Sequence, residues 1–229
     1  MTGLPGDDSP LSGAGASRLL ASGYQGAVYL TETPRGAVIV KKPLGRGFAR
    51  AVRGAMLRRE YRIYQRLPGI PGIPRCLGLQ HGDELVLEFI DGKSLRTLRD
   101  GPPDRERFFA ALLQLIQAMH RAGVAHGDLK RKDNILLGPG GQPFLIDFGT
   151  AVSAPPGAGL LRRLLFRQLR RMDLNAWIKM KYRGQWSDID PADLQYHHPT
   201  LPEWLARIIR RPWRALTFRR RRKARRAGR

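Results

Sequence analysis

Apolar and polar residues follow two different spacings along the chain, one typical of strands and one typical of helices. Residues Gly36–Lys42 hold four consecutive apolar residues before two lysines, which indicates a strand. Helical spacing appears in residues 51–67, in the long amphipathic stretch 105–123 and in the apolar, arginine-rich stretch 159–183. In the first of these the recurring apolar residues are Met56, Leu57, Tyr61, Tyr64 and Leu67. The pattern therefore predicts an α+β chain whose second half is mainly helical.

The predicted strand ends in Lys41 and Lys42. Successive strand residues face opposite sides, so only one of these two side chains can point into a site on a given face. Lys41 directly follows Val38-Ile39-Val40 and is preferred for the site, which leaves Lys42 on the outer face. The alternative for either lysine is a solvated position at the edge of a sheet.

A lysine in a site must be held by a carboxylate, and the sequence offers one candidate. Glu60 is the only acidic residue between positions 33 and 82, and it lies inside the predicted helix 51–67. Arginines on both sides of Glu60 offer an alternative, in which it makes local ion pairs. The lack of a competing acid favours a pair between Glu60 and the site lysine.

A glycine-containing segment precedes the predicted strand. Gly23, Gly26 and Val28 stand at the spacing of a phosphate-binding loop of the type G-x-G-x-x-G-x-V, with Ala21 in place of its first glycine. Glycines let backbone N–H groups approach phosphates closely because no Cβ intervenes. A plain hairpin is the alternative, and only the motifs that follow make the loop persuasive.

Two aspartates follow apolar segments further along the chain. Asp128 stands in His126-Gly-Asp-Leu-Lys130, and Asp147 stands in Ile146-Asp-Phe-Gly149. Phosphoryl transfer from ATP requires such a pair, because the chemistry is mostly positioning and charge neutralisation. One carboxylate meets the attacking hydroxyl, and the other holds the metal ions that bridge the phosphates. Each motif alone could be a turn or a strand end, but their order and spacing favour a kinase site.

Together these segments resemble the protein-kinase-like superfamily, in the form of a small bacterial member similar to Rio-type kinases and to kinases of lipopolysaccharide sugars. The resemblance runs from about Leu20 to Phe148, in the order of the family's motifs. Within it, Leu85–Leu95 is similar to the fifth strand, the hinge and the first C-lobe helix. The resemblance implies an α+β, bilobed protein-kinase-like fold with a five-stranded antiparallel N-lobe and a shortened helical C-lobe.

The resemblance also implies roles for individual residues. Asp128 would be the catalytic base, and Lys130 would lie near the transferred phosphate, as in serine/threonine protein kinases. Lys41 and Glu60 would form the ion pair beside the nucleotide, and Asn134 and Asp147 would hold Mg²⁺ or Mn²⁺. The implied ATP contacts are Gly23, Gly26, Val28, Lys41 and the backbone near Glu88 and Ile90.

The catalytic loop departs from the family's pattern at two positions. The metal-binding Asn usually follows the catalytic Asp by five residues, whereas here Asp133 is fifth and Asn134 is sixth. Both side chains offer oxygen to magnesium, and Asn134 is preferred because it runs directly into a predicted strand. Gly127 replaces the arginine that pairs with a phosphorylated activation loop, so regulation of that kind is not expected.

The resemblance divides the chain into four parts. Residues 1–17, rich in Gly, Ser and Pro, are predicted to be disordered. Residues 18–92 form the nucleotide-binding N-lobe and residues 93–190 the catalytic C-lobe. Residues 191–229 form a basic amphipathic tail. A length of 229 residues is too short for the full C-lobe of a protein kinase, and no Ala-Pro-Glu motif follows Asp147.

Charge is concentrated at the end of the chain. The formal net charge is +22, and residues 201–229 hold 12 Lys or Arg against one Glu. Trp204, Trp213 and Phe218 are interleaved with these charges, a combination that indicates an interfacial helix on an anionic membrane. Nucleic acid is the less favoured partner, and a solvated tail is the third alternative.

The remaining features concern the compartment. Cys76 is the single cysteine, which excludes an intramolecular disulfide and fits a reducing cytoplasm. The first residues include Asp7 and Asp8 and lack an apolar stretch, so no signal peptide is expected. No run of about eighteen apolar residues appears. The expected location is cytoplasmic, with peripheral attachment to the inner membrane through the tail.

The sequence therefore predicts an ATP-dependent kinase that transfers the γ-phosphoryl group to a hydroxyl. A serine/threonine-type protein kinase is preferred. The alternatives are a lipopolysaccharide core sugar kinase at the cytoplasmic membrane face and a pseudokinase scaffold whose tail binds the partner. The motif residues at positions 41, 60, 128, 134 and 147 argue against the pseudokinase.

Overall fold

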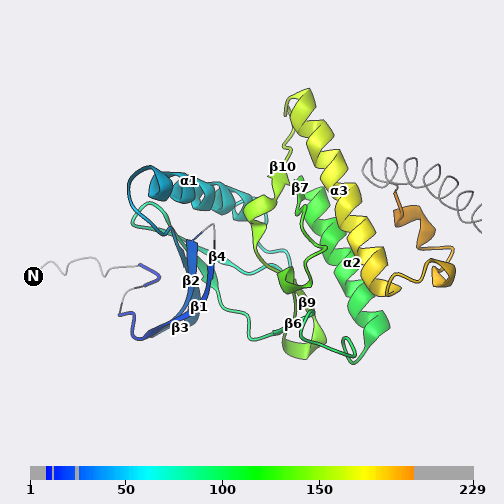
Figure 1. Cartoon of the computed structure of the whole chain (residues 1–229), viewed down its shortest axis with the longest axis horizontal. Helices are drawn as coiled ribbons and strands as arrows, with labels where there is room; N and C mark the ends of the chain where they lie inside the picture. Colours follow the sequence, from blue (N-terminus) through cyan, green and yellow to red (C-terminus); the bar gives the residue numbers. More distant parts are fainter. Residues whose placement is uncertain (1–8, 12, 24–25, 199–229) are drawn as a thin grey trace, which may run out of the picture.

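Five antiparallel strands form a sheet in the first part of the molecule (Figure 1). The computed structural model describes residues 9–11, 13–23 and 26–198. The order of the strands across the sheet is β1-β2-β3-β5-β4. Their bounds are Ser17–Gly23 for β1, Gly26–Thr33 for β2, Gly36–Lys42 for β3, Cys76–Gln80 for β4 and Glu84–Glu88 for β5.

The two faces of this sheet pack differently. Val38, Val40 and Val86 are buried together on one face, where Leu11 and Tyr29 contact them. On the opposite face the residues that alternate with these belong to the main core, including Ile39, Leu85 and Leu87. Because β3 alternates, Lys41 shares a face with Ile39, and Lys42 shares a face with Val40.

Helix α1 (Gly47–Tyr64) lies against the sheet and connects it to the second half of the molecule (Figure 1). Its buried residues include Leu57, Glu60, Ile63 and Tyr64, which recur at helical spacing and so occupy one face. Tyr64 meets Phe148 edge to face, with ring centroids 5.0 Å apart. The helix therefore carries a buried acid directly beside the segment that contains Asp147.

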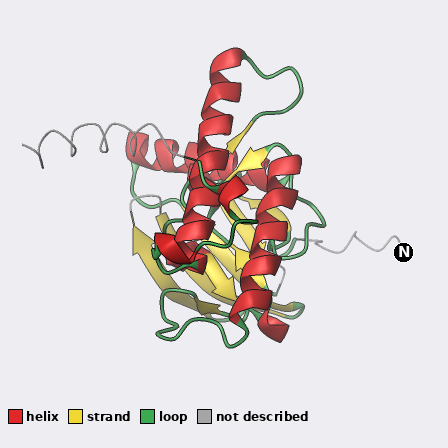
Figure 2. Cartoon of the chain, turned by 90° about the vertical axis from the view of Figure 1, so that its right-hand side faces the viewer, coloured by secondary structure: helices red, strands yellow, loops and turns green. Residues whose placement is uncertain are grey.

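Two long helices, α2 (Arg105–Arg121) and α3 (Leu160–Lys181), pack together in the second half (Figures 1 and 2). Phe108, Leu112, Leu115 and Met119 form the buried face of α2. Trp177 of α3 is 1% exposed, and its indole N–H donates to the backbone oxygen of Phe109 at 2.8 Å. These contacts make one core with the inner face of the sheet.

Short strands between the helices carry the loops of the site. β6 (Lys93–Ser94), β8 (Ile135–Leu137) and β9 (Pro143–Leu145) form one small antiparallel sheet. β7 (Val124–Ala125) and β10 (Val152–Ser153) form another. Single turns of 3₁₀ helix at η1 (Lys132–Asn134) and η3 (Phe148–Thr150) follow the two predicted site aspartates. Further turns are η2 (Pro139–Gly141), η4 (Trp186–Asp188) and η5 (Leu194–Tyr196).

The protein thus has the α+β, bilobed kinase-like fold that the sequence predicted, with an antiparallel sheet and few helices. One predicted element is wrong. Instead of a first C-lobe helix near Leu95, the chain forms β6 and then a turn, in which Thr97 N–H donates to the Ser94 backbone oxygen at 2.9 Å. The Ser94 hydroxyl accepts from Arg96 N–H, and this local bond competes with helix formation.

The ends of the described chain are held by hydrogen bonds. The N–H of Gly15 donates to the backbone oxygen of Glu32 at 2.9 Å, which extends the β1–β2 ladder into the stretch predicted to be disordered. Backbone pairing needs no apolar side chains, so composition gave no signal for it. At the other end, Asp193 accepts from Lys181 of α3.

The basic tail from residue 199 onward lies outside the described residues, and its interfacial helix stays a prediction. No helix of the described part is long and apolar enough to span a bilayer.

Candidate active site

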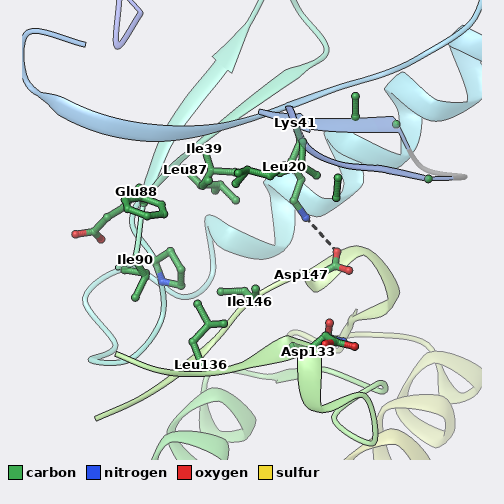
Figure 3. Close-up of a pocket in the computed structure, with 18 of the residues that line it drawn as sticks. Leu20, Ile39, Lys41, Leu87, Glu88, Ile90, Asp133, Leu136, Ile146 and Asp147 are labelled. Carbon is green, nitrogen blue, oxygen red and sulfur yellow. Dashed lines mark hydrogen bonds and ion pairs between the residues drawn. The ribbon is translucent and has the colours of Figure 1, made fainter. Parts of the chain in front are cut away.

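A cavity of about 720 Å³ lies between the five-stranded sheet and the helical part of the molecule (Figure 3). Leu20, Ile39 and Leu87 line it from the sheet, while Leu136 and Ile146 line it from the opposite side. Two apolar layers therefore face each other across the cavity. A flat heteroaromatic ring fits such a slot, because both of its faces are removed from water.

Lys41, Glu60 and Asp147 meet at one end of this cavity. The Lys41 ammonium donates to Glu60 Oε1 at 2.7 Å and to Asp147 Oδ1 at 3.0 Å, the second of which is drawn in Figure 3. Glu60 is 1% exposed, and the same oxygen accepts from the backbone N–H of Phe148 at 3.2 Å. One buried carboxylate thus fixes both the lysine and the backbone next to Asp147.

The charges of this cluster support one another. Burial opposes the charge on Lys41, but the carboxylates of Glu60 and Asp147 outweigh it and raise the pKa of the lysine above its ordinary value. For Asp147, burial acts to raise the pKa, yet the Lys41 ammonium dominates and the pKa is lowered. Both groups therefore remain charged around neutral pH, the state in which they interact with phosphates and cations.

Lys42 also lines the cavity, but its ammonium is engaged elsewhere. Its ammonium lies 3.1 Å from Glu84 Oε2, and its side chain is 41% exposed against 13% for Lys41. The alternation along β3 explains this difference, since neighbouring residues face opposite sides. Of the two lysines that the sequence left open, the structure directs Lys41 toward Glu60 and Asp147.

Gly23 ends β1 and Gly26 begins β2 at the edge of the cavity. Gly23 and Gly26 pair with each other, and both line the cavity together with Val28. Gly26 has φ +146°, and a Cβ at this position would collide with the backbone oxygen of Lys42. Only glycine permits this approach of two strands. Residues 24 and 25 lie outside the described residues.

The segment after β5 forms the edge of the cavity opposite Lys41. Glu88 and Ile90 both line it, but the Glu88 carboxylate is directed away from the interior (Figure 3). That carboxylate instead accepts from the backbone N–H of Arg75 at 2.9 Å. Contact with a ligand at this edge therefore falls to the backbone and to the side chain of Ile90.

Asp128 lies in the loop between β7 and η1, with its side chain 16% exposed. The Asn134 side-chain N–H donates to the backbone oxygen of Asp128 at 3.1 Å, which ties the two ends of the loop together. Arg131 approaches the Asp128 carboxylate to 3.8 Å. Leu129 is buried in the core, so the loop is anchored between Asp128 and Lys130.

The extra residue of the loop separates the environments of Asp133 and Asn134. Asp133 is 43% exposed and accepts from Arg96 at 3.1 Å and from Ser94 at 3.3 Å. Asn134 is buried, and its amide nitrogen is engaged by Asp128, which leaves its amide oxygen as an acceptor. Both residues line the nucleotide-sized cavity. Asn134 is the last residue of the turn η1 and directly precedes strand β8, so the additional residue lies before it in the loop.

Glu60, Asp128 and Lys130 are predicted site residues that do not line this cavity, and of these Lys130 lies farthest from the role predicted for it. Its side chain is exposed and lines a second cavity, formed with the end of α3. Leu129 occupies the core between Asp128 and Lys130 and so separates their side chains.

Asp173 of α3 holds the catalytic loop through hydrogen bonds to its backbone. It is fully buried, and its two oxygens accept from the backbone N–H groups of His126 and Gly127, each at 2.8 Å. His120 Nε2 lies 3.0 Å from the same carboxylate. Because both of its oxygens are engaged and the side chain is fully buried, Asp173 has a structural role and is not a surface aspartate.

Arg59 and His126 hold the segment around Asp147 through hydrogen bonds that sequence reasoning did not find. Asp147 has φ +65°, a conformation costly for most residues and recurrent at functional sites. Arg59 of α1 donates to the backbone oxygens of Gly149, at 2.8 Å, and of Ala151. The His126 ring donates to the backbone oxygen of Ile146 at 3.0 Å. Arg59 binds backbone carbonyl oxygens, which every residue has. The sequence therefore contains no particular residue type that would reveal the partner of this arginine.

Comparison with known proteins identifies the family to which this chain belongs. The family model of the RIO domain matches residues 46–168 of this chain. A 3-deoxy-D-manno-octulosonic acid kinase of Stenotrophomonas maltophilia (strain R551-3) is 30% identical, covering 78% of this chain and 76% of the relative. The protein of that name from Xanthomonas oryzae pv. oryzae (strain PXO99A) is 29% identical over 86% and 84% of the two chains.

A plant cyclin-dependent kinase matches a smaller part of this chain. A putative cyclin-dependent kinase F-2 of Oryza sativa subsp. japonica is 40% identical, but the match covers 36% of this chain and 29% of the plant protein. The fold and the charged cluster define a protein-kinase-like, ATP-dependent phosphotransferase. The chain belongs to the RIO-domain family.

Proposed function

We propose that this kinase phosphorylates a hydroxyl group of 3-deoxy-D-manno-octulosonic acid, the lipopolysaccharide-sugar alternative that the sequence left open. The observation that carries the proposal is that relatives named for this sugar acid match more than three quarters of both chains. The protein-kinase alternative has less support, because the plant cyclin-dependent kinases match less than half of their own lengths. The chain also lacks an Ala-Pro-Glu motif after Asp147.

For the nucleotide, we propose that the adenine ring lies between the apolar layers formed by Ile39 and Leu136. The backbone near Glu88 and Ile90 would bond its edge. Lys41, held by Glu60, would contact the phosphates, and the backbone of Gly23 and Gly26 would approach them from the ends of β1 and β2. The support is spatial, since these groups line one cavity from the ring slot to the charged end.

Asn134 and Asp147 are the proposed ligands of a divalent cation. Both line the cavity and offer hard oxygen donors, the ligand type that Mg²⁺ and Mn²⁺ prefer. Within the described residues no group of three or more His, Cys, Asp or Glu side chains could hold a metal, so phosphate oxygens would complete the ligand set. A cation bound there would neutralise the phosphate charge during transfer. Asp133 is engaged by Arg96 and is the less suitable ligand.

Asp128 is the proposed base. It would accept the proton of the sugar hydroxyl while the hydroxyl oxygen bonds to the γ-phosphorus and the bond from that phosphorus to the β–γ bridging oxygen breaks, with ADP as the leaving group. The loop that carries Asp128 is held at both ends, by Asp173 through the backbone and by Asn134. This bracing would keep the carboxylate in position without assistance from the substrate.

The test is a comparison of acceptors with the purified full-length chain. ADP formation from ATP is measured with a 3-deoxy-D-manno-octulosonic acid-containing lipopolysaccharide core, with the free sugar acid, and with a mixture of serine- and threonine-containing peptides. We expect turnover with the first two and a phosphorylated sugar by mass spectrometry. Turnover restricted to the peptides would establish the protein-kinase alternative instead.

We further propose that the chain attaches to the cytoplasmic face of the membrane through the first turns of α3. Figures 1 and 2 show these turns extending beyond the rest of the molecule. Leu160 and Leu161 are 72% and 81% exposed, and Leu164 and Leu165 are exposed beside them. Five arginines lie between residues 162 and 171, with no acid among them. Apolar residues flanked by cations complement an anionic bilayer, whereas the basic segment 201–229 carries like charge and would be repelled from this face.

Replacing Leu160 and Leu161 with serine is therefore expected to weaken binding to vesicles that contain anionic phospholipid, measured by co-sedimentation at low salt. Leu19→Ser with Leu77→Ser is the matched control, because it also removes two exposed leucines, but from the sheet. A second arm deletes residues 201–229. Loss of binding only in that deletion would assign the membrane contact to the tail, and equal binding by all variants would remove both surfaces.

A further inference from the structure

A second cavity, of about 530 Å³, is lined by Lys130 and Lys132 of the catalytic loop, whereas Arg131, Asp133 and Asn134 of the same loop line the first cavity. The walls of the second cavity come from the stretch after β6, the start of α2, the catalytic loop and the end of α3. Leu95, Leu98, Phe109 and Met180 supply an apolar part of the lining. Six of the other lining residues are basic and one, Asp100, is acidic. The basic residues are Arg99, Arg105, Lys130, Lys132, Lys179 and Arg183.

Within the described part of the chain these positive charges lack ion-pair partners, although Asp100 lines the cavity and Glu106, against burial and Arg183, acts to raise the pKa of Arg105 in part. Among the residues that the structure describes, no carboxylate oxygen lies within ion-pair distance of any of the six side chains. Arg105 donates to the backbone oxygen of Met180 at 2.7 Å, and Arg183 donates to that of Asp100 at 3.3 Å. By contrast, Lys181, outside the cavity, is paired with both Glu106 and Asp193. The cavity therefore gathers six cationic side chains, none of which forms an ion pair with a carboxylate of the described residues.

The electrostatics of Arg105 agree with this arrangement. Burial and then the neighbouring Arg183 guanidinium lower the pKa of Arg105 from its ordinary value. Like charges held near one another in a concave site disfavour their own ionisation and favour a bound anion. The backbone bonds and the ring of Phe109, 4.8 Å from the Arg105 guanidinium, hold this side chain in place before any ligand arrives.

The cavity is close to the proposed base. Lys130 and Lys132 belong to the catalytic loop, and Lys130 is two residues from Asp128. Two residues of extended chain span at most about 7 Å, so the cavity begins within the length of a sugar from Asp128. A ligand with an anionic group among the lysines would therefore lie beside the loop that carries Asp128.

We propose that this cavity binds an anionic group of the phosphate acceptor, a carboxylate or a phosphate, and so selects negatively charged acceptors. The inference rests on the proposed function, because it requires that the acceptor be phosphorylated next to Asp128. The sugar acid named above carries a carboxylate and fits the site. A peptide that displays lysine or arginine would be repelled, which distinguishes this surface from one that recognises basic sequences.

The first experiment measures binding directly. The full-length chain is saturated with ADP, so that added anions cannot enter the nucleotide cavity, and is titrated calorimetrically with inorganic phosphate, with free 3-deoxy-D-manno-octulosonic acid, and with mannose as the neutral sugar. We expect both anions to bind and mannose not to bind. Lys179→Gln with Arg183→Gln should weaken anion binding about tenfold or more, a factor that corresponds to about 1.4 kcal/mol. These two positions lie outside the catalytic loop, so their replacement leaves its backbone bonds intact.

The matched control is Arg167→Gln with Arg171→Gln, which removes two exposed charges from the same helix but not from the cavity. In steady-state assays the Lys179 and Arg183 variant should raise the KM for the acceptor about tenfold and the KM for ATP much less. The absence of anion binding by the unmodified chain, or equal weakening by the control pair, would overturn the proposal. Anion binding that depends on Lys179 and Arg183, without phosphorylation of the sugar acid, would sustain the site and refute only the choice of acceptor.

Discussion

Asp147→Ala is expected to abolish metal-dependent nucleotide binding and to lower turnover by at least about 10³-fold. A cation that neutralises charge during phosphoryl transfer contributes several kcal/mol to the transition state, and about 4 kcal/mol corresponds to that factor. Asp147 is 39% exposed toward the cavity, and Lys41 keeps its partner Glu60 after the substitution, so the fold should persist. Binding of a fluorescent ATP analogue with and without Mg²⁺, and ADP release, measure the two effects.

Backbone strain is a competing cause that a second variant removes. Asp147 has φ +65°, a region in which alanine is disfavoured and asparagine is tolerated. If the carboxylate charge matters, Asp147→Asn should be nearly as inactive as Asp147→Ala. Recovery of activity in the asparagine variant would instead attribute the loss to the backbone.

Asn134 and Asp133 are the two candidates for the second ligand of the cation beside Asp147, and the same assays compare them. Asn134→Ala should reduce turnover strongly, because it removes an oxygen donor and the bond that closes the catalytic loop. Asp133→Ala should have a small effect, because its carboxylate is already paired with Arg96. A larger loss at Asp133 than at Asn134 would assign the cation to Asp133.

The parts of this site that could be predicted from the sequence are those in which one residue type has one partner type. Glu60 was the only acid in its region, so its pairing with a lysine followed by elimination, and alternation along the strand favoured Lys41. The strand at residues 36–42 and the helices also followed from apolar spacing, whereas the five-stranded antiparallel sheet was implied by the resemblance to the kinase superfamily. The predicted helix 159–183 and the observed α3 (Leu160–Lys181) differ by a few residues.

What could not be predicted depends on backbone groups or on distant segments. Arg59 binds the carbonyl oxygens of residues 149 and 151, and every residue has such an oxygen, so no pattern marks the partner. The basic cavity gathers residues from positions 95 to 183, which only the packing of α2 against α3 brings together. In a chain with 41 Lys and Arg, single lysines such as Lys179 carry no signal of their own. The misplaced helix near Leu95 shows the same limit, since a resemblance carries over motifs more reliably than the elements between them.

Asp128→Asn is expected to leave ATP binding nearly unchanged while lowering turnover by about 10²-fold or more, the usual effect of removing a positioned base. Asparagine has nearly the same shape and keeps the backbone contacts of Asp128 with His126 and Asn134, so the loop should retain its conformation. Asp128 is not part of the lining of the nucleotide cavity, which is why binding and turnover should separate. Asp133→Asn is the matched control, because it neutralises another carboxylate of the same loop, five residues further on. If the two variants lose activity equally, the effect is one of loop charge and Asp128 is not the base. If only Asp128→Asn loses turnover, with the KM for ATP preserved, its carboxylate acts on the acceptor hydroxyl.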